Sequence, residues 1–442
     1  MAWSYIAQRA ITGEFLDWDL PLEIAGVEWQ LSGPGSLKAT ISPDVGGLRA
    51  SDGGLLLEEW GTLIHAEHDG LIRWSGILIT SNFNGENWEL EAAGYGTYPH
   101  AVTWEGDYSA IGIDPTYAIR LIWEHIQSFP DGNLGVVVTG ATDTGVRMGT
   151  PAPVWPGPTT PVVWLQSYID AHPESTEKRP AAIEIRDRIA SGQPIAEDWT
   201  WDGCSALVSE YNDELVSDYN SAQSPSTEEA KPYELVWYES TNCGDEIDDL
   251  AKLAPLDWVE NHYWAPDHES IIHEINLAFP RAGRRRDDLV FTQGDNVTNV
   301  VTIESNGDEF ANNIVGLGAG EGRAMVRRET SLRDGRLRRV HVLADKTVSD
   351  LARMDALIAE ELNYRRAAVR VESIDVIDHP NAPIGSWSLG DDVMVRAELP
   401  WLGEINVWCR VTGWSLTGEN TATLTLVRSD LYRYGGAPVD PA

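Results

Sequence analysis

One phrase occurs twice in this chain, once near each end, and this repetition restricts the fold more than any other feature. The first copy spans residues 73–78 and 85–90, and the second spans residues 410–416 and 418–426. Each copy has a strand-like run with a central glycine, a Gly-Glu-Asn turn, and a return run that alternates apolar and polar residues. The repetition predicts two related β units at opposite ends of one polypeptide.

Other parts of the sequence predict further strands and a few helices. Residues 1–100 contain short alternating runs with regularly spaced turn signals, including Asp69-Gly70, which is typical of a barrel or sandwich. Residues 324–343 have the pattern of a hairpin around Asp334-Gly335, and the polar residues 217–232 that of an exposed loop. Apolar spacing and capping residues predict helices near residues 114–129, 160–169, 244–254 and 347–364.

The predicted fold class is therefore α+β and β-rich, with several domains. Two related β-barrel-type domains at the chain ends flank smaller α+β domains. With about 150 residues per domain as a loose guide, we expect an N-terminal β-barrel domain at 1–105, a helical and loop-rich insertion at 106–232, a central α+β domain at 233–345, and a helix plus C-terminal β-barrel domain at 346–442.

The charge of the chain is strongly acidic and unevenly distributed. The formal net charge is −37, with 32 Lys+Arg against 69 Asp+Glu; residues 281–370 alone hold 16 basic and 14 acidic residues. Such a surface does not favour nucleic-acid binding, because that affinity comes largely from cationic contacts with phosphate. A strongly acidic charge is expected of a very soluble or salt-adapted protein, or of a surface past which DNA must slide.

The sequence gives no sign of export or of a membrane span. The first residues lack the basic start and apolar run of a signal peptide, and no window approaches 18 uninterrupted apolar residues. The three cysteines, Cys204, Cys243 and Cys409, have no metal-ligand spacing and are odd in number. We expect folding in a reducing cytosol without a disulfide framework.

No catalytic, cofactor-binding or metal-binding residue is predicted. The glycine-rich residues 316–322 lack a following Lys-Ser/Thr and precede a strand, so they are interpreted as a β connector and not as a phosphate loop. His262, His268 and His273 match no common zinc spacing. With so many acids, a glycosidase carboxylate pair cannot be recognised from spacing.

Arginines gather in two runs of the sequence. Three interpretations stay open: nucleic-acid contact, which the interleaved acids weaken; contact with a neighbouring subunit through planar guanidinium forks; and a solvated face without a partner. The first run holds Arg281, Arg284, Arg285 and Arg286. The expected subunit-interface residues are in the second run: Arg323, Arg327, Arg328, Arg336, Arg338 and Arg339.

Several segments together resemble a known family. Residues 59–64, 71–78 and 93–95 resemble the opening domain of minor tail proteins of siphophages that infect actinobacteria. Residues 312–318 resemble the middle of the same proteins, and residues 389–395 resemble the segment before their terminal β unit. This is the baseplate hub, or tail-associated, family. The resemblance covers about 1–130 and 233–430, whereas residues 133–232 match nothing.

The resemblance implies a homotrimer at the distal end of a phage tail, with two tube-like β-barrel domains per subunit in a pseudo-six-fold ring. The implied partners are the hexameric distal tail protein or tail tube, the C-terminal end of the tape-measure protein, and other minor tail or receptor-binding proteins. DNA would pass through the lumen without specific binding. Assembly would take place in the host cytoplasm, and the protein would end in the virion as a structural, non-enzymatic part.

Two residue sets and two alternatives complete the expectations. The ring β units are expected to centre on Trp74, Gly76 and Trp88 in the first copy and on Trp408, Gly413 and Trp414 in the second. The 19 tryptophans are scattered, as is usual for core or interface residues. A tail protein that stacks receptor or cell-wall glycans on tryptophan, and a tail-tip cell-wall hydrolase, remain the alternatives.

Overall fold

The chain forms two compact units in the computed structural model. Unit 1 comprises Met1–Tyr108, Asp114–Val146 and Leu235–Ala442, and unit 2 comprises Ser109–Ile113 and Arg147–Glu234. The structure describes residues 3–51, 53–152, 160–172, 178–192, 206–222, 229–254, 256–299, 303–304, 310–366, 370–400, 403–418 and 420–429.

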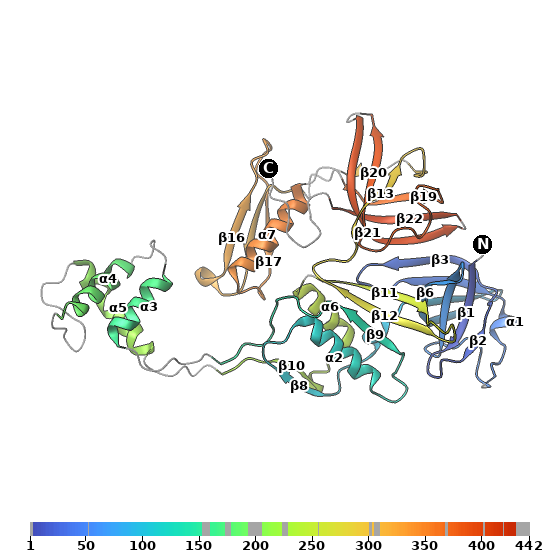
Figure 1. Cartoon of the computed structure of the whole chain (residues 1–442), viewed down its shortest axis with the longest axis horizontal. Helices are drawn as coiled ribbons and strands as arrows, with labels where there is room; N and C mark the ends of the chain where they lie inside the picture. The colour runs from blue at the N-terminus through green and yellow to red at the C-terminus, as the bar shows by residue number, and fades with distance from the viewer. Residues whose placement is uncertain are drawn as a thin grey trace. The chain divides into compact units, whose positions relative to one another are not determined.

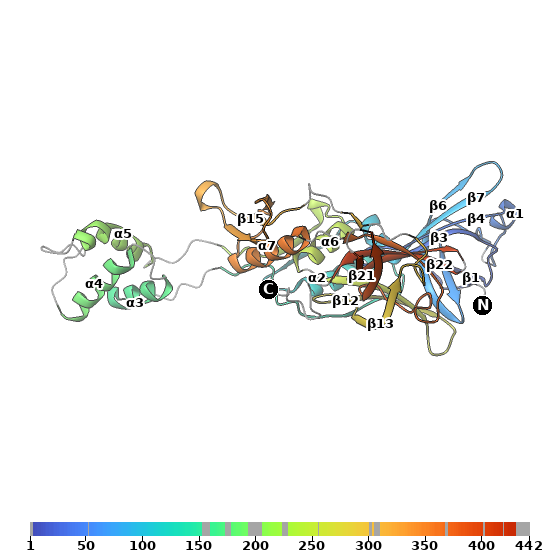
Figure 2. The same cartoon turned by 90° about the horizontal axis from the view of Figure 1, so that it is seen from above.

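The N-terminal part of unit 1 is a run of antiparallel strands. Asp69 and Gly70 both have positive φ and turn β5 into β6, as the hairpin signal predicted. The β6–β7 turn lies at the outer end of a long hairpin, which Figure 2 shows from above. The elements are β1 (Trp3–Arg9), β2 (Phe15–Asp17), β3 (Glu23–Gln30), β4 (Ser36–Ile41), α1 (Pro43–Gly46), β5 (Thr62–His68), β6 (Leu71–Phe83), β7 (Trp88–Ala93) and the 3-10 helix η1 (Tyr95–Ala101).

The C-terminal part of unit 1 adds strands to the same sheet. Twelve of the described strands form this sheet, in the order β13-β20-β21-β3-β4-β7-β6-β5-β1-β2, with β22 and β19 following from β21. The added strands are β13 (Arg285–Thr292), β19 (Ser373–Ile377), β20 (Asp392–Leu399), β21 (Gly403–Gly418) and β22 (Thr421–Arg428).

The two chain ends repeat one strand order. In the first, the sheet order β4-β7-β6-β5 is antiparallel throughout. In the second, β19-β22-β21-β20 has the same order relative to the sequence and is also antiparallel throughout. In each β unit the hairpin strands, β6 with β7 and β21 with β22, have a bulge in their register. The two related β units therefore share a topology as well as a phrase.

The two β units meet where β3 pairs with β21, and Figure 1 shows these strands side by side. Trp29 and Trp414 are paired in this register, and their rings stack at a centroid distance of 3.8 Å with planes 2° apart. One continuous core runs through both β units, from Leu37 and Ile64 to Val393 and Leu424. The joined sheet thus behaves as one packed body.

The predicted fold class is confirmed: the chain is β-rich α+β with several sheets and helices. The pairing of the described strands forms no closed barrel, because β2 and β13 end the main path. The C-terminal β unit comes nearest to closure. Its strands run in the order β13-β20-β21-β22-β19, and an isolated bridge joins Val297, which follows β13, to Val376 of β19.

A smaller α/β layer in unit 1 packs two helices near a three-stranded sheet. Asp114 caps the first helix as predicted, accepting a hydrogen bond of 2.9 Å from the Thr116 amide. Strand β9 pairs in parallel with β12 and was missed, because its short Val-rich run lies within residues the sequence analysis left unplaced. The elements are α2 (Pro115–Gln127), β9 (Val136–Gly140), the 3-10 helix η2 (Trp237–Glu239), α6 (Cys243–Leu253), β11 (Asp257–Trp264) and β12 (Ile271–Ala278).

A second small α+β group contains the arginine run. The predicted hairpin of residues 324–343 is wrong, because β15 lies between the two strands; it pairs antiparallel with β16 and parallel with β17. Sequence spacing cannot reveal an inserted strand. The elements are β14 (Ile303–Glu304), β15 (Asn313–Leu317), the 3-10 helix η3 (Gly322–Ala324), β16 (Arg327–Ser331), β17 (Val340–Ala344), α7 (Leu351–Arg366) and β18 (Arg370–Val371).

The described part of unit 2 contains three helices with a core of their own. Leu165, Ile169, Ile185 and Leu215 are buried there. The loop expected at 217–232 is wrong over 217–222, which continue a helix; residues 223–228 lie outside the described residues. The helices are α3 (Pro161–Ala171), α4 (Lys178–Ala190) and α5 (Ala206–Ala222), and the short strands β8 (Asp107–Ala110) and β10 (Tyr233–Val236) pair where the chain enters and leaves.

Candidate functional site

The residues predicted for the first ring β unit lie on the β6–β7 hairpin. Trp74 is buried, and Gly76, two residues on, allows β6 and β7 to approach closely. A Cβ added to Gly76 would lie 2.5 Å from the Ala93 carbonyl oxygen and would also overlap the Trp74 ring. Trp88 is half-buried at the start of β7 and packs against the main core. Gly76 and Trp74 lie at the inner part of the hairpin, and Trp88 pairs with Phe83 next to the turn.

The residues predicted for the second ring β unit lie on β21. Trp414 is buried between Trp29 and Trp387, and the Trp387 ring meets it edge-on at 5.6 Å. Gly413 lies at the bulge beside Trp414. Trp408 is half-buried, and the Arg285 guanidinium stacks on its ring, with the guanidinium carbon 3.7 Å from the ring centroid. The tryptophans of the second ring β unit therefore contact β3 and β13.

Sequence reasoning missed the partners of Trp414. Trp29 stacks on it from β3, donates its own indole N–H to the Arg73 carbonyl at 2.8 Å, and so links β3 to β6. The strand containing Trp29 was predicted, but its pairing with a strand near the other chain end was not. A strand pattern specifies which residues face the core and does not specify the partner strand.

The predicted interface arginines lie mostly on β16 and on the connection to β17, and most have partners within their own chain. Arg327 and Arg338 share Glu329, at 2.7 and 3.1 Å, and Arg336 pairs with Asp334. Arg328 reaches Asp355 on α7 at 3.1 Å. The backbone N–H of Arg339 donates to the side chain of Asn312 at 2.8 Å. The side chain of Arg323 lies outside the described residues. Their role at a subunit interface stays a prediction.

The Leu389-Gly390-Asp391 segment has a structural role. Gly390 has φ of +87° and packs directly against the backbone of Ala282 and Gly283, where no side chain would fit. The Asp391 carboxylate accepts a hydrogen bond from the Arg284 amide at 2.9 Å and pairs with Arg286 at 3.2 Å. The segment therefore fixes the chain before β13 against the start of β20.

The Asn312–Gly318 region also has a structural role. Asn313 donates a hydrogen bond to Glu329 on β16 at 3.0 Å. A Cβ on Gly316 would overlap Met354 and Ile358 of α7, so the glycine allows the helix to lie against β15. The expectation of a β connector in place of a phosphate loop fits this arrangement.

A buried polar network joins the N-terminal β unit to β11 and β12. The Tyr95 hydroxyl lies 3.0 Å from Nε2 of His273, and Nδ1 of His273 lies 3.1 Å from Nδ1 of His262. The His65 ring stacks over His273 at 5.7 Å. His65 is held separately, because its Nδ1 lies 2.8 Å from the Ser75 hydroxyl and its Nε2 lies 3.0 Å from the Gln8 side-chain oxygen. Each imidazole therefore has hydrogen-bond partners that do not require it to be charged.

Burial sets the ionisation of this network. It lowers the pKa of His262 to about 3 and the pKa values of His65 and His273 well below the ordinary range, the neighbouring imidazoles adding to the shifts of His65 and His273. Burial also raises the pKa of Glu260 to about 7, although the Gly96 amide donates to its carboxylate at 2.7 Å. Within the described residues, no group of three or more His, Cys, Asp or Glu is arranged to hold a metal ion.

Three aromatic rings form a stacked cluster that we call the aromatic platform: the half-buried Phe15 and Trp264 and the exposed Trp18. Phe15 and Trp18 stack at 4.4 Å, and Trp18 lies 6.1 Å from Trp264 with planes 18° apart. Phe15 and Trp264 rest on a small core formed by Ile6, Ile72 and Ile271, whereas Trp18 is 56% exposed. A large exposed ring supported by two half-buried rings is a candidate binding surface.

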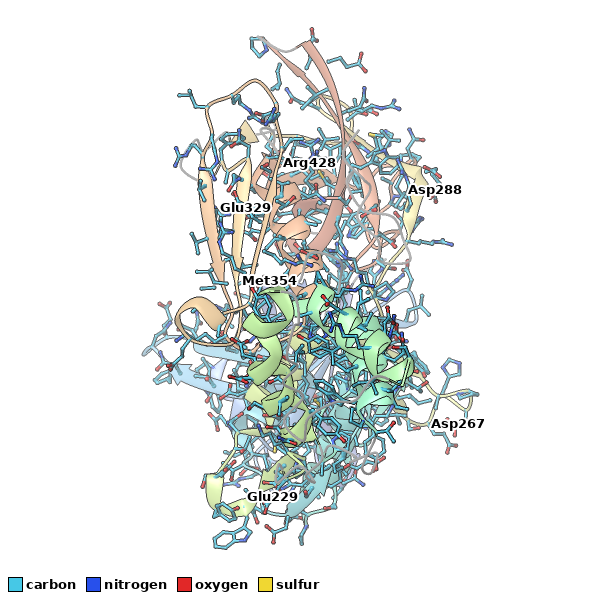
Figure 3. The ribbon with its side chains drawn as sticks, turned by 90° about the vertical axis from the view of Figure 1, so that its left-hand side faces the viewer. Glu229, Asp267, Asp288, Glu329, Met354 and Arg428 are labelled. Carbon is cyan, nitrogen blue, oxygen red and sulfur yellow. The ribbon has the colours of Figure 1, made fainter. Side chains whose placement is uncertain are left out.

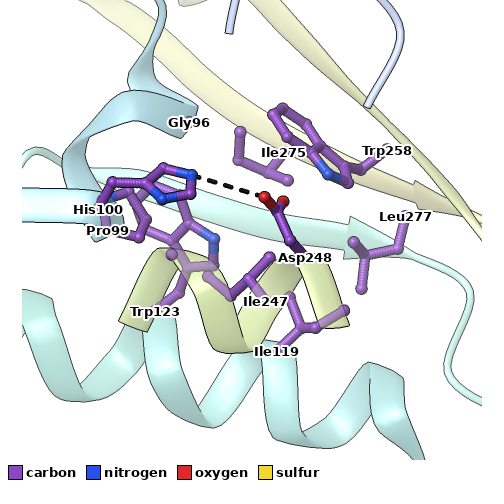
Figure 4. Close-up of a pocket in the computed structure, with 11 residues that line it drawn as sticks. Gly96, Pro99, His100, Ile119, Trp123, Ile247, Asp248, Trp258, Ile275 and Leu277 are labelled. Carbon is purple, nitrogen blue, oxygen red and sulfur yellow. Dashed lines mark ion pairs between the residues drawn. The ribbon is translucent and has the colours of Figure 1, made fainter. Parts of the chain in front are cut away.

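Two hollows in unit 1 differ greatly in size. The first, shown in Figure 4, lies among η1, α2, α6, β11 and β12, has His100 and Asp248 at 3.9 Å beside it, and encloses only about 10 Å³, about the space of one water molecule. The second, of about 660 Å³, is an open hollow lined by charges of both signs, including Arg286, Asp288 and Arg396. None of the helices in the described part of the chain is long and apolar enough to cross a membrane.

Comparison with known proteins gives a fold relationship. No protein-family model matches the sequence, and no curated protein sequence matches it. The solved 43 kDa tail protein of prophage MuSo2 from Shewanella oneidensis matches with a TM-score of 0.52 and 10% identity, covering 96% of this chain and 97% of that chain. A tail protein from Neisseria meningitidis MC58 matches with a TM-score of 0.50 and 12% identity, covering 97% of each chain. The similarity shows a shared fold over nearly the whole of each chain.

Proposed function

We propose that this chain is a structural protein of a bacteriophage tail and that three copies form the baseplate hub at its distal end. The observation that carries the proposal is the strand order shared by the two β units, β4-β7-β6-β5 and β19-β22-β21-β20. Three copies supply six such units, and six similar units can mate with a six-fold tube. The match in fold to two tail proteins supports the same assignment.

The proposed division of labour follows the predicted domains. Residues 1–105 and 346–442 would form the tube-like ring, with the hairpins β6–β7 and β21–β22 lining or bracing it. Residues 106–232 and 233–345 would extend from the ring and hold other minor tail or receptor-binding proteins. The upper partner would be the distal tail protein or tail tube, and the lumen would hold the end of the tape-measure protein and later pass DNA.

The acidic charge suits this proposed channel. A net charge of −37 per copy makes binding of the DNA backbone unfavourable, so DNA would slide without sticking to the wall. The function is then adaptation between two symmetries and requires no bond cleavage. Siphophage tails, particularly those of phages of actinobacteria, remain the proposed setting.

The test is the mass and symmetry of the purified chain, followed by its position in a virion. Light scattering should give three times the 48.7 kDa chain mass, and electron-microscopic class averages should show three-fold symmetry with six similar lobes in one ring. Antibody labelling should mark the distal tip of the tail. A persistent monomer, or label elsewhere on the particle, would contradict the proposal.

One observation favours the alternative of a receptor- or glycan-binding tail protein. The aromatic platform exposes the ring of Trp18, and an exposed tryptophan can stack on a sugar. Under that alternative, cell-wall oligosaccharides should change the tryptophan fluorescence of the wild-type chain and of Trp237→Ala, which removes an exposed tryptophan elsewhere, but not of Trp18→Ala. A fall in the turbidity of cell walls on adding the protein would instead support a hydrolase.

A further inference from the structure

We infer that copies of this chain join head to tail through one specific contact, in which an arginine-rich loop of one copy docks on the aromatic platform of the next. We call residues 332–339, which connect β16 to β17, the arginine loop. The inference rests on the proposed trimer and adds to it the two surfaces that meet.

The platform has the chemistry of a receptor for guanidinium groups. The two segments that carry its rings, residues 11–19 and 264–270, contain no Lys or Arg. Figure 3 shows Asp267 on a loop that projects from the ribbon. A guanidinium group is attracted both by the face of a tryptophan ring and by a carboxylate beside it. The five acids in these segments are Glu14, Asp17, Asp19, Asp267 and Glu269.

The arginine loop has the complementary chemistry. Residues 327–339 hold six arginines and two acids, so a positive excess remains after the ion pairs with Glu329 and Asp334. Arg338 and Arg333 are both exposed, and Leu337 between them in the loop is 89% exposed. Arginine is enriched at protein interfaces, and the exposed Leu337 offers apolar surface that a partner can bury.

Charge complementarity selects a second copy as the occupant. Two copies at net −37 repel each other, so a stable contact between them needs a local meeting of opposite charges. The arginine run is where the chain concentrates positive charge, and the platform combines the acids of its two segments with the exposed ring of Trp18. Because the two surfaces differ, the contact is heterologous, and heterologous contacts that close generate rings.

Charge reversal on each surface tests the contact. The platform variant carries Asp267→Arg with Glu269→Arg, and the loop variant carries Arg333→Glu with Arg338→Glu. In sedimentation velocity each should raise the dissociation constant of the trimer at least tenfold, because like charges then face each other. The variant with all four changes restores opposite charges and should recover most of the lost affinity. The exposed substitutions Lys346→Glu and Asp213→Arg, outside both surfaces, are matched controls that should leave assembly unchanged.

Removal of the apolar anchors tests the head-to-tail direction. Trp18→Ala removes the exposed ring of the platform and Leu337→Ala removes the exposed leucine of the loop, and each variant alone should be largely monomeric. Mixed together, they retain one intact contact per pair, so they should form pairs that cannot close into trimers. Circular dichroism of every variant should show the wild-type fold.

Three outcomes would overturn the inference, and they separate it from the proposed function. A trimer that survives platform reversal refutes this contact and leaves the hub proposal standing. A wild-type chain that is monomeric at every concentration reached refutes both. If chitooligosaccharide binds the wild type but not Trp18→Ala, while both assemble equally, the platform is a glycan site and not a subunit contact.

Discussion

The guanidinium of Arg410 on β21 pairs with the carboxylate of Asp257, the first residue of β11, and both side chains are largely buried. Arg410 also donates to the Ala282 carbonyl at 2.9 Å, and Asp257 accepts from the Ala282 amide at 2.8 Å. The pair therefore fixes the C-terminal β unit to β11 through one shared residue. Removing either member leaves a charge without its partner in a poorly hydrated place.

Replacing Arg410 should be costly. We expect Arg410→Met to lower the free energy of unfolding by about 3 kcal/mol, because Asp257 then remains buried without its cation. The double variant with Asp257→Asn should lose less than the sum of the two single losses, since the pair is coupled. Urea unfolding followed by circular dichroism measures all three. Additive losses would show that the ion pair contributes nothing specific.

The glycines of the two ring β units, Gly76 and Gly413, should differ in how much stability the protein loses when each is replaced by alanine. Gly76→Ala places a methyl group 2.5 Å from the Ala93 carbonyl oxygen, and we expect a loss of about 1–3 kcal/mol from overpacking. At Gly413 the nearest atom to the new methyl group is the Trp29 carbonyl oxygen at 3.2 Å, so Gly413→Ala should lose much less. The same unfolding assay compares them. Equal losses would contradict the difference in packing.

Acid should destabilise the chain through its buried histidines. The folded-state pKa values of His65, His262 and His273 are lowered, so below about pH 6.5 the unfolded chain binds more protons and stability falls. Glu260 acts oppositely, because its pKa of about 7 keeps one extra proton on the folded chain between about pH 4.5 and 7. The net difference is about two protons, so the free energy of unfolding should fall by roughly 2–3 kcal/mol per pH unit between about pH 6 and 5.

The variant His262→Asn isolates the contribution of one imidazole. It removes one of the protons bound on unfolding, so its stability should depend less steeply on pH than that of the wild type. Urea midpoints at closely spaced pH values give both slopes. Identical slopes would mean that His262 does not titrate on unfolding in this range.

The outer part of unit 2 should be removable. Thr150 and Lys231 exchange backbone hydrogen bonds of 2.7 and 2.8 Å, so the chain leaves and returns at adjacent points. Replacing residues 152–229 with a short Gly-Ser linker removes α3, α4 and α5 and should leave the melting of unit 1 nearly unchanged. Thermal unfolding by circular dichroism tests this, with limited proteolysis as a check of compactness. An insoluble or unfolded product would show that unit 1 depends on these helices.

Local features of the fold could be predicted from the sequence, and distant pairings could not. The Asp69-Gly70 hairpin and the cap at Asp114 depend on neighbouring residues, and both predictions are confirmed. The pairing of β3 with β21 and the insertion of β15 between β16 and β17 depend on segments far apart or out of order in the chain. A strand pattern has many compatible partners, and only the complete packing selects one.

The candidate site follows the same division. The six arginines were identified as a positively charged group, but their ion pairs with Glu329, Asp334 and Asp355 require the three-dimensional arrangement of β16 and α7. The aromatic platform was missed, because Trp18 and Trp264 are distant in sequence. Scattered tryptophans give no indication of which ones gather on the surface.

The pairing between Gln30 and Gly413 has a consequence for synthesis of the protein. The ribosome releases β3 long before β21 exists, so the nascent chain carries a bare strand edge during most of its translation. A bare edge pairs readily with other nascent chains and leads to aggregation. Efficient production should therefore depend on host chaperones that shield this edge, and fragments that stop before β21 should accumulate in inclusion bodies.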